Sequence, residues 1–149
     1  MSTLAEPAIV ALCRRRIERL DPNAPAQWGR MNARQMVCHL NDSFRVAMGE
    51  RYATPVGSVL SRTWIKWIAL RTPLQWPQGV QTRPEIEQGR GGTPPSEWER
   101  DRAELLDLLS VFPNGKTFGE HPAFGKMSRR DWMVWGYRHV DHHLRQFGA

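Results

Sequence analysis

Two histidines four residues apart, His139 and His143, are the residues best placed to do chemistry. Residues at this spacing share one face of a helix. With about 100° between successive residues, both fall on the apolar stripe of the last helical segment, whereas His142 falls towards the flank that carries Arg145. Such a pair can hold a divalent metal ion. The alternative from the residues alone is a pair of hydrogen-bonded core histidines, since an unpaired buried polar group costs about 1–3 kcal/mol.

Two other histidines give weaker signals. His39 lies in the middle of a second helical segment, beside its apolar stripe rather than at the centre, so a surface imidazole is the default interpretation from the pattern. His121 opens a loop ahead of the last helix. About 16 Å of helix would separate that loop from His139. We therefore expect a structural role for His121, unless the loop folds back.

Four segments follow one another in an order and spacing that together are fairly specific. They read WGRMNARQMVCHLND (28–42), TRPEI (82–86), GEHPAFG (119–125) and HVDHHLRQFG (139–148). In these segments the chain resembles the DinB/YfiT-like metalloprotein superfamily, and more narrowly a DinB-related bacterial subfamily of unassigned function. The resemblance covers residues 28–148. It implies a four-helix bundle and a metal site made of His39, His139 and His143.

The resemblance also implies a reaction class. Three imidazoles leave an open position on a tetrahedral ion, which suits a catalytic site better than a structural one. Zinc is the first expectation, with nickel or iron as alternatives, because three nitrogen ligands discriminate poorly between metals. The superfamily implies an enzyme that transfers a low-molecular-weight thiol to an electrophile. The alternatives are a hydrolase that uses metal-bound water, or a non-catalytic, metal-stabilised binding module.

Asp42 and Gln146 are the candidate catalytic residues beside this site. Asp42 is one turn from His39 and could reach the metal or orient a water, although a carboxylate on the helix surface is the interpretation that we prefer. Gln146 lies one turn after His143 and could hydrogen-bond a ligand. Its alternative is an ordinary amide at a helix end. The Pro- and Gly-rich connection 72–95 departs from many superfamily members and is expected to reshape the pocket.

The hydrophobic pattern predicts an all-α protein, a DinB-like four-helix bundle with long irregular loops and short extra helical segments. The expected helices span residues 6–20, 32–48, 56–70, 96–109 and 128–146. Asn32 with Gln35, and Ser96 with Glu99, predict capping boxes at two helix starts. The segment 56–70 has apolar residues that could lie on a membrane surface. A partly buried helix of the bundle is the interpretation that we prefer.

Composition sets the remaining expectations. A chain of 149 residues, of which 40% are hydrophobic and 24% charged, predicts a single globular domain over residues 1–149. The net charge of +6 comes from arginines scattered over the sequence, so nucleic acid is not an expected partner. Cys13 and Cys38 are read as reduced thiols, and no signal peptide is apparent, so we expect a cytoplasmic protein. The expected partner is a small-molecule substrate, a low-molecular-weight thiol being the candidate, with no membrane partner and a homodimer as the candidate assembly.

Overall fold

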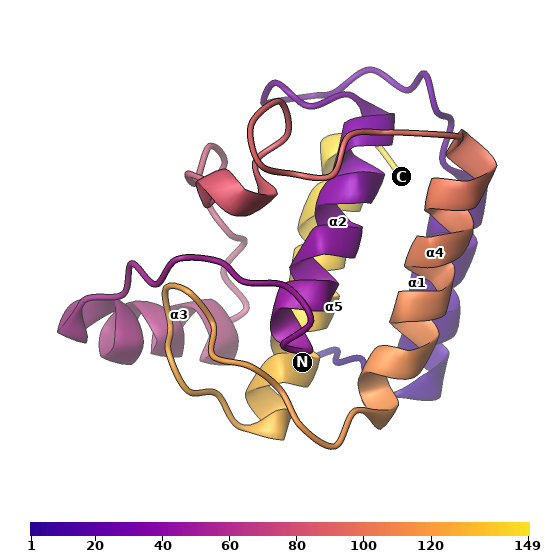
Figure 1. Cartoon of the computed structure of the whole chain (residues 1–149). Coiled ribbons are helices and arrows are strands. Elements are labelled where there is room, and N and C mark those ends of the chain that lie inside the picture. Colours follow the sequence, from indigo (N-terminus) through magenta and orange to yellow (C-terminus); the bar gives the residue numbers. More distant parts are fainter.

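The computed structural model describes all residues from Met1 to Ala149, and it is all-helical, as the hydrophobic pattern predicts. Four long helices dominate it, and they are α1 (Pro7–Arg19), α2 (Ala33–Ala47), α4 (Trp98–Val111) and α5 (Arg129–Gln146). Shorter elements are the π-helical turn η1 (Ser61–Ile65), α3 (Lys66–Arg71) and the 3₁₀ turns η2 (Pro84–Ile86) and η3 (Phe112–Asn114). In Figure 1 the long helices lie side by side, while η1 and α3 project from them at the lower left.

One hydrophobic core joins the four long helices. Helix α2 packs against α4 and α5, and α1 packs against the same two helices. Each helix contributes side chains that are fully buried, among them Ile17 from α1, Phe44 from α2, Leu105 from α4 and Leu144 from α5. Burying a side chain of this size contributes roughly 1.5–3 kcal/mol. This core fixes α2 against α5, the two helices that carry the candidate ligands.

Helix starts show where local sequence signals hold and where they fail. The capping box of Asn32 and Gln35 is confirmed, and Ser128 with Asp131 forms a second one at the start of α5. The box predicted at Ser96 is wrong, because α4 begins at Trp98. The backbone N–H and the hydroxyl of Ser96 instead donate to the buried carboxylate of Asp101, at 2.8 and 2.6 Å. A tertiary acceptor therefore replaces the local cap.

The third helical segment differs most from its prediction. Helix begins at residue 59 rather than 56, because the backbone N–H groups of Val56 and Gly57 donate to the Pro122 carbonyl instead. Leu70 is the only buried residue in η1 and α3, whereas Trp64 is 67% exposed. The segment is partly buried, as expected, because Leu70 belongs to the core and Ala69 packs against it, but most of the segment projects from the long helices. None of the helices is long and apolar enough to cross a membrane.

Candidate metal centre

His39 from α2 and the pair His139 and His143 from α5 meet at one point between these two helices. Each residue offers one ring nitrogen, and the three nitrogens all lie within 4.8 Å of one another. The ring of His39 is centred 5.4 Å from that of His139 and 4.9 Å from that of His143. The structure thus brings together the three residues that the sequence singled out, from segments about a hundred positions apart.

The helical spacing of the α5 pair produces the closest contact in the cluster. The Nε2 atoms of His139 and His143 are 3.1 Å apart. His39 is 4% exposed and His143 is 8% exposed. A surface position, the default expectation for His39 from its helical pattern, is therefore wrong. Burial of His39 follows from a contact that the pattern of one helix does not contain, because η2 packs over α2 at this point.

Hydrogen bonds fix the tautomers of two of the three rings. The Nδ1 atom of His39 lies 3.2 Å from the backbone carbonyl of Ile86, and the Nδ1 atom of His143 lies 2.9 Å from Oε1 of Gln146. Both partners can only accept, so each Nδ1 carries the proton and each Nε2 keeps its lone pair. The Gln146 amide is oriented in turn, since its Nε2 donates to the Trp28 carbonyl at 2.7 Å. Metal-ligating histidines commonly show this arrangement, with the second ring nitrogen donating to a carbonyl.

The geometry of the cluster fits a small divalent ion after modest adjustment. Tetrahedral ligands about 2.0–2.1 Å from zinc would lie about 3.3 Å from one another. The His139–His143 contact, at 3.1 Å, is already near that value. The widest separation, up to 4.8 Å, would have to close by somewhat more than 1 Å.

Burial keeps the three imidazoles neutral. Desolvation is the largest cause that lowers the pKa of His39, His139 and His143. Mutual repulsion adds to it, because a charge on either neighbour of His139 further lowers its pKa. A neutral imidazole offers the lone pair that a metal needs. The cluster is therefore ready to act as a set of nitrogen ligands near neutral pH.

Asp42 has a role that neither of its two interpretations anticipated. Its side chain is fully buried rather than on the helix surface, so the preferred interpretation is wrong. The Oδ1 atom accepts from Arg51 Nη1 and from the Thr93 hydroxyl, both at 2.7 Å, and Oδ2 accepts from the Thr93 N–H, also at 2.7 Å. The carboxylate lies outside the histidine cluster. Its oxygens hold the loop rather than a metal or a water.

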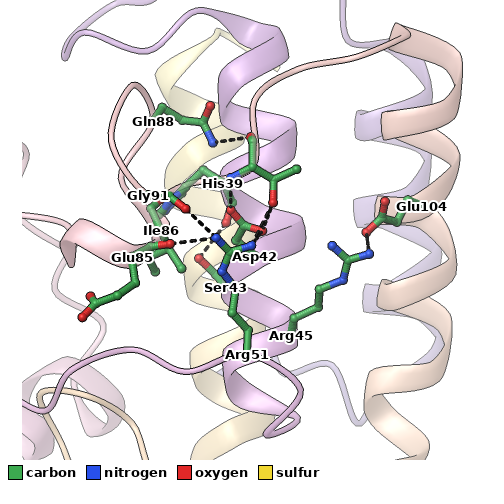
Figure 2. A network of polar contacts seen from close by, with 11 residues as sticks. His39, Asp42, Ser43, Arg45, Arg51, Glu85, Ile86, Gln88, Gly91 and Glu104 are labelled. Carbon is green, nitrogen blue, oxygen red and sulfur yellow. Dashed lines mark hydrogen bonds and ion pairs between the residues drawn. The ribbon is translucent and has the colours of Figure 1, made fainter.

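The network around Asp42 explains how the loop covers His39. Arg51 also donates to the backbone carbonyls of Glu85 and Gly91, at 2.8 and 2.6 Å (Figure 2). These bonds clamp the chain on either side of Ile86, whose carbonyl faces the His39 ring (Figure 2). This clamp was not predicted from the sequence. The only sequence feature of the clamp is a single arginine just after a helix. No pattern in the sequence indicates that Arg51 contacts residues 85–93.

The two remaining histidines lie outside the cluster. The ring of His142 is centred 5.6 Å from that of Trp28 and 6.3 Å from that of Trp76, and its Nδ1 is buried without a hydrogen-bond partner. The loop that carries His121 does fold back, placing this ring 5.8 Å from that of Trp135. The Nδ1 of His121 accepts the N–H groups of residues 123 and 124, so it holds its own turn.

The rings of Trp135 and Trp76 lie beside the cluster, and neither was assigned to the site from the sequence. The ring of Trp135 is centred 4.9 Å from that of His139, and the ring of Trp76 lies 6.0 Å from it. A cavity of about 270 Å³ lies beside Trp76, lined also by Tyr137 and Arg138. A second, of about 390 Å³, lies beside Trp28. Neither is lined by a histidine of the cluster, so both are neighbours of the site and not the site itself.

Comparison with known proteins corrects the family assignment. The family model that matches is described as "Protein of unknown function (DUF1569)", and the match covers residues 8–149. The resemblance to the DinB/YfiT-like superfamily, and to a DinB-related subfamily, is therefore wrong as an assignment, because no family model of that group matches the chain. Neither the curated proteins nor the solved structures contain a match. The chain belongs to the DUF1569 family.

Proposed function

We propose that this protein is a divalent-metal-dependent enzyme whose ion is held by His39, His139 and His143. The observation that carries the proposal is the convergence of three ring nitrogens within 4.8 Å, from two helices that share one core. Two of these rings are backed by acceptors that leave Nε2 free for a metal. We further propose that α1, α2, α4 and α5 act as a four-helix bundle, a scaffold that builds metal sites from facing helices.

The number of ligands favours catalysis over a structural role. The group contains three residues and no fourth histidine, cysteine or carboxylate. Structural zinc sites are closed by four protein ligands, whereas catalytic sites keep a position for water or substrate. Zinc is the ion to test first, and nickel and iron are the alternatives, because neutral imidazoles suit all three. A non-catalytic, metal-stabilised module is the competing interpretation, and it predicts that the remaining position stays closed to small ligands.

A divalent ion at this point would supply Lewis-acid activation of a water or a thiol. The chain's own residues set the conditions for that chemistry. Ile86 and Gln146 fix two rings through their Nδ1 atoms, and Trp135 and Trp76 exclude bulk water beside His139. His139 is the least buried residue of the three, so we propose that a small-molecule substrate approaches from its side.

Hydrolysis is the reaction that we favour. Transfer of a low-molecular-weight thiol rested on the family resemblance, which the family match overturns. Neither protein thiol is poised as a nucleophile, because burial raises the pKa of Cys13 to about 11 and that of Cys38 to about 12. Attack by an activated water needs no second substrate. Small esters and amides are therefore the first substrates to test, with thiol transfer as the second candidate.

The test is a reaction screen on protein reconstituted with one metal at a time. Zinc, nickel or iron is added to chelator-treated protein, which is then assayed with ester and amide substrates and, separately, with thiols plus electrophiles. We expect turnover that requires metal and is lost in His139→Ala, while His142→Ala retains it. Turnover that persists in both the chelated protein and His139→Ala would remove the histidine cluster from the reaction.

A further inference from the structure

Exposed apolar side chains are concentrated in one part of the chain. Of the 13 large hydrophobic residues that are exposed, ten lie between Tyr52 and Val80. The most exposed on the projecting helix are Val59 at 82% and Trp64 at 67%. Isolated surface apolar residues are common, but a contiguous group of this kind marks an interaction site. We call the set formed by the exposed side chains of residues 59–68 the apolar ridge, and its members are Val59, Leu60, Trp64, Ile65, Trp67 and Ile68.

The projecting helix is turned so that its apolar side faces outward. Lys66 is only partly exposed and its Nζ donates to the carbonyl of Lys126, while Leu70, one turn later, is buried. Arg62, one turn earlier, lies with its stem beside Gly125. Leu60, Trp64 and Ile68 follow one another at helical spacing on the other side, away from the protein. Lys66 therefore packs on the protein, Arg62 stays exposed beside it, and the helix presents its apolar side to the surroundings.

The charged side chains of the segment that carries the ridge all have one sign. From Arg51 to Pro84 the sequence contains no aspartate or glutamate, whereas Arg62, Lys66 and Arg71 lie in the helix itself. Asp131 pairs with Arg71 at 2.5 Å. No ion pair engages Arg62 or Lys66, and the exposed Lys126 lies beside Lys66. Arg62, Lys66 and Lys126 are thus basic residues near the apolar ridge that no ion pair balances.

We propose that the apolar ridge docks the protein on a membrane surface rich in anionic lipids. Tryptophan and isoleucine side chains enter the boundary between headgroups and acyl chains, and nearby basic residues attract anionic headgroups. No membrane partner was expected from the sequence, because this segment was interpreted as a partly buried helix of the bundle. Its exposure removes that reason. The helix lies on the surface and does not cross the bilayer, in keeping with the absence of a membrane-spanning helix.

Charge favours an anionic membrane surface over a second copy of the chain as the partner of the apolar ridge. Two ridges packed against each other would place the exposed Arg62 and Lys126 of both copies near one interface, and residues 51–84 offer no carboxylate to neutralise them. The net charge of +6 adds to that repulsion. An anionic surface has the opposite sign and satisfies both the apolar and the basic part of the region. The proposal does not depend on the metal centre, which lies between α2 and α5.

Vesicle flotation with the purified full chain tests the proposal. The probes are vesicles of phosphatidylcholine alone and vesicles of phosphatidylcholine mixed with phosphatidylglycerol. We expect binding to the mixed vesicles only. Trp64→Ser should weaken it roughly tenfold or more, since a tryptophan buries a large apolar area in the interface, and Arg62→Glu should weaken it as well. Val111→Ser, which removes an exposed apolar side chain from α4 instead of from the ridge, is the matched control and should bind normally.

Each other result would overturn the proposal. Absence of binding to the mixed vesicles, or equal binding to both kinds, would contradict the role assigned to anionic lipid. Light scattering after gel filtration adds an independent readout. A dimer that Trp64→Ser converts to a monomer, while Val111→Ser does not, would assign the ridge to a second copy instead. Circular dichroism should show that Trp64→Ser folds normally, because the side chain is mostly in solvent.

Discussion

Substituting Asp42 by asparagine tests how the loop over the histidine cluster is held. Every partner of this carboxylate is a donor: Arg51 Nη1, the Thr93 hydroxyl and the Thr93 N–H. Asparagine keeps the shape, but it removes the charge and points an NH₂ group at one of these donors. The substitution therefore breaks the network without creating a cavity.

The expected loss of stability depends on how deeply each partner of the ion pair between Asp42 and Arg51 is buried. Breaking a buried pair costs about 3–5 kcal/mol. The lower end applies here, because Asp42 is fully buried but the Arg51 side chain is 26% exposed and keeps its bonds to Glu85 and Gly91. We expect a loss of about 3 kcal/mol of unfolding free energy. For a chain of this length, that corresponds to a fall of about 6–12 °C in Tm.

The assay is urea and thermal unfolding of the metal-free protein, followed by circular dichroism, together with a zinc titration. Loosening the Ile86 carbonyl should also weaken zinc binding by about tenfold, through His39. The control is Glu87→Gln, which removes an exposed pair with Arg90 and should cost less than about 1 kcal/mol. Stability of Asp42→Asn within about 1 kcal/mol of the parent would refute the role of this clamp.

Two further predictions concern the histidines. Gln146→Leu removes the acceptor of His143 Nδ1, so we expect about a 10–100-fold loss of zinc affinity by calorimetry; an unchanged affinity would show that the amide is an ordinary helix end. Burial, and then the charge of Lys66, lowers the pKa of His121 to about 4. Below the unfolded value of about 6.5, the unfolded chain binds a proton that the folded protein excludes, so stability should fall by about 2 kcal/mol between about pH 7 and pH 5 and level off near pH 4. Urea unfolding of metal-free His121→Gln should show a weaker dependence on pH in this range than the parent, and an identical dependence would contradict a neutral, buried His121.

The sequence predicted what depends on local pattern. The four long helices follow from apolar periodicity, and the start of α2 follows from the reciprocal bonds of Asn32 and Gln35. The pair His139 and His143 follows from helical spacing, because one turn brings their Nε2 atoms into contact. These features depend on residues at most a few positions apart, and a sequence displays such relationships directly.

Features that depend on tertiary contacts were not predictable in the same way. Asp42 was interpreted as a surface carboxylate, but it is enclosed by Arg51, nine residues later, and by Thr93, 51 residues later. Helix α4 begins at Trp98 and not at residue 96 as predicted, because the backbone N–H of Ser96 donates to the buried carboxylate of Asp101. The segment 56–70 was interpreted as a partly buried helix of the bundle because its composition is apolar, but composition does not state how much of a helix meets the core. The short motifs suggested a superfamily that the family match does not support.

The central claim is that three imidazoles bind one ion, and metal analysis of the purified protein tests it most directly. Chelator-treated protein is loaded with zinc, dialysed and analysed by atomic emission, in parallel with His143→Ala and His142→Ala. We predict about one zinc per chain for the parent and for His142→Ala, and almost none for His143→Ala, the expectation for a single His₃ site. Zinc retained at the same level in His143→Ala, or absent from all three proteins, would contradict the account.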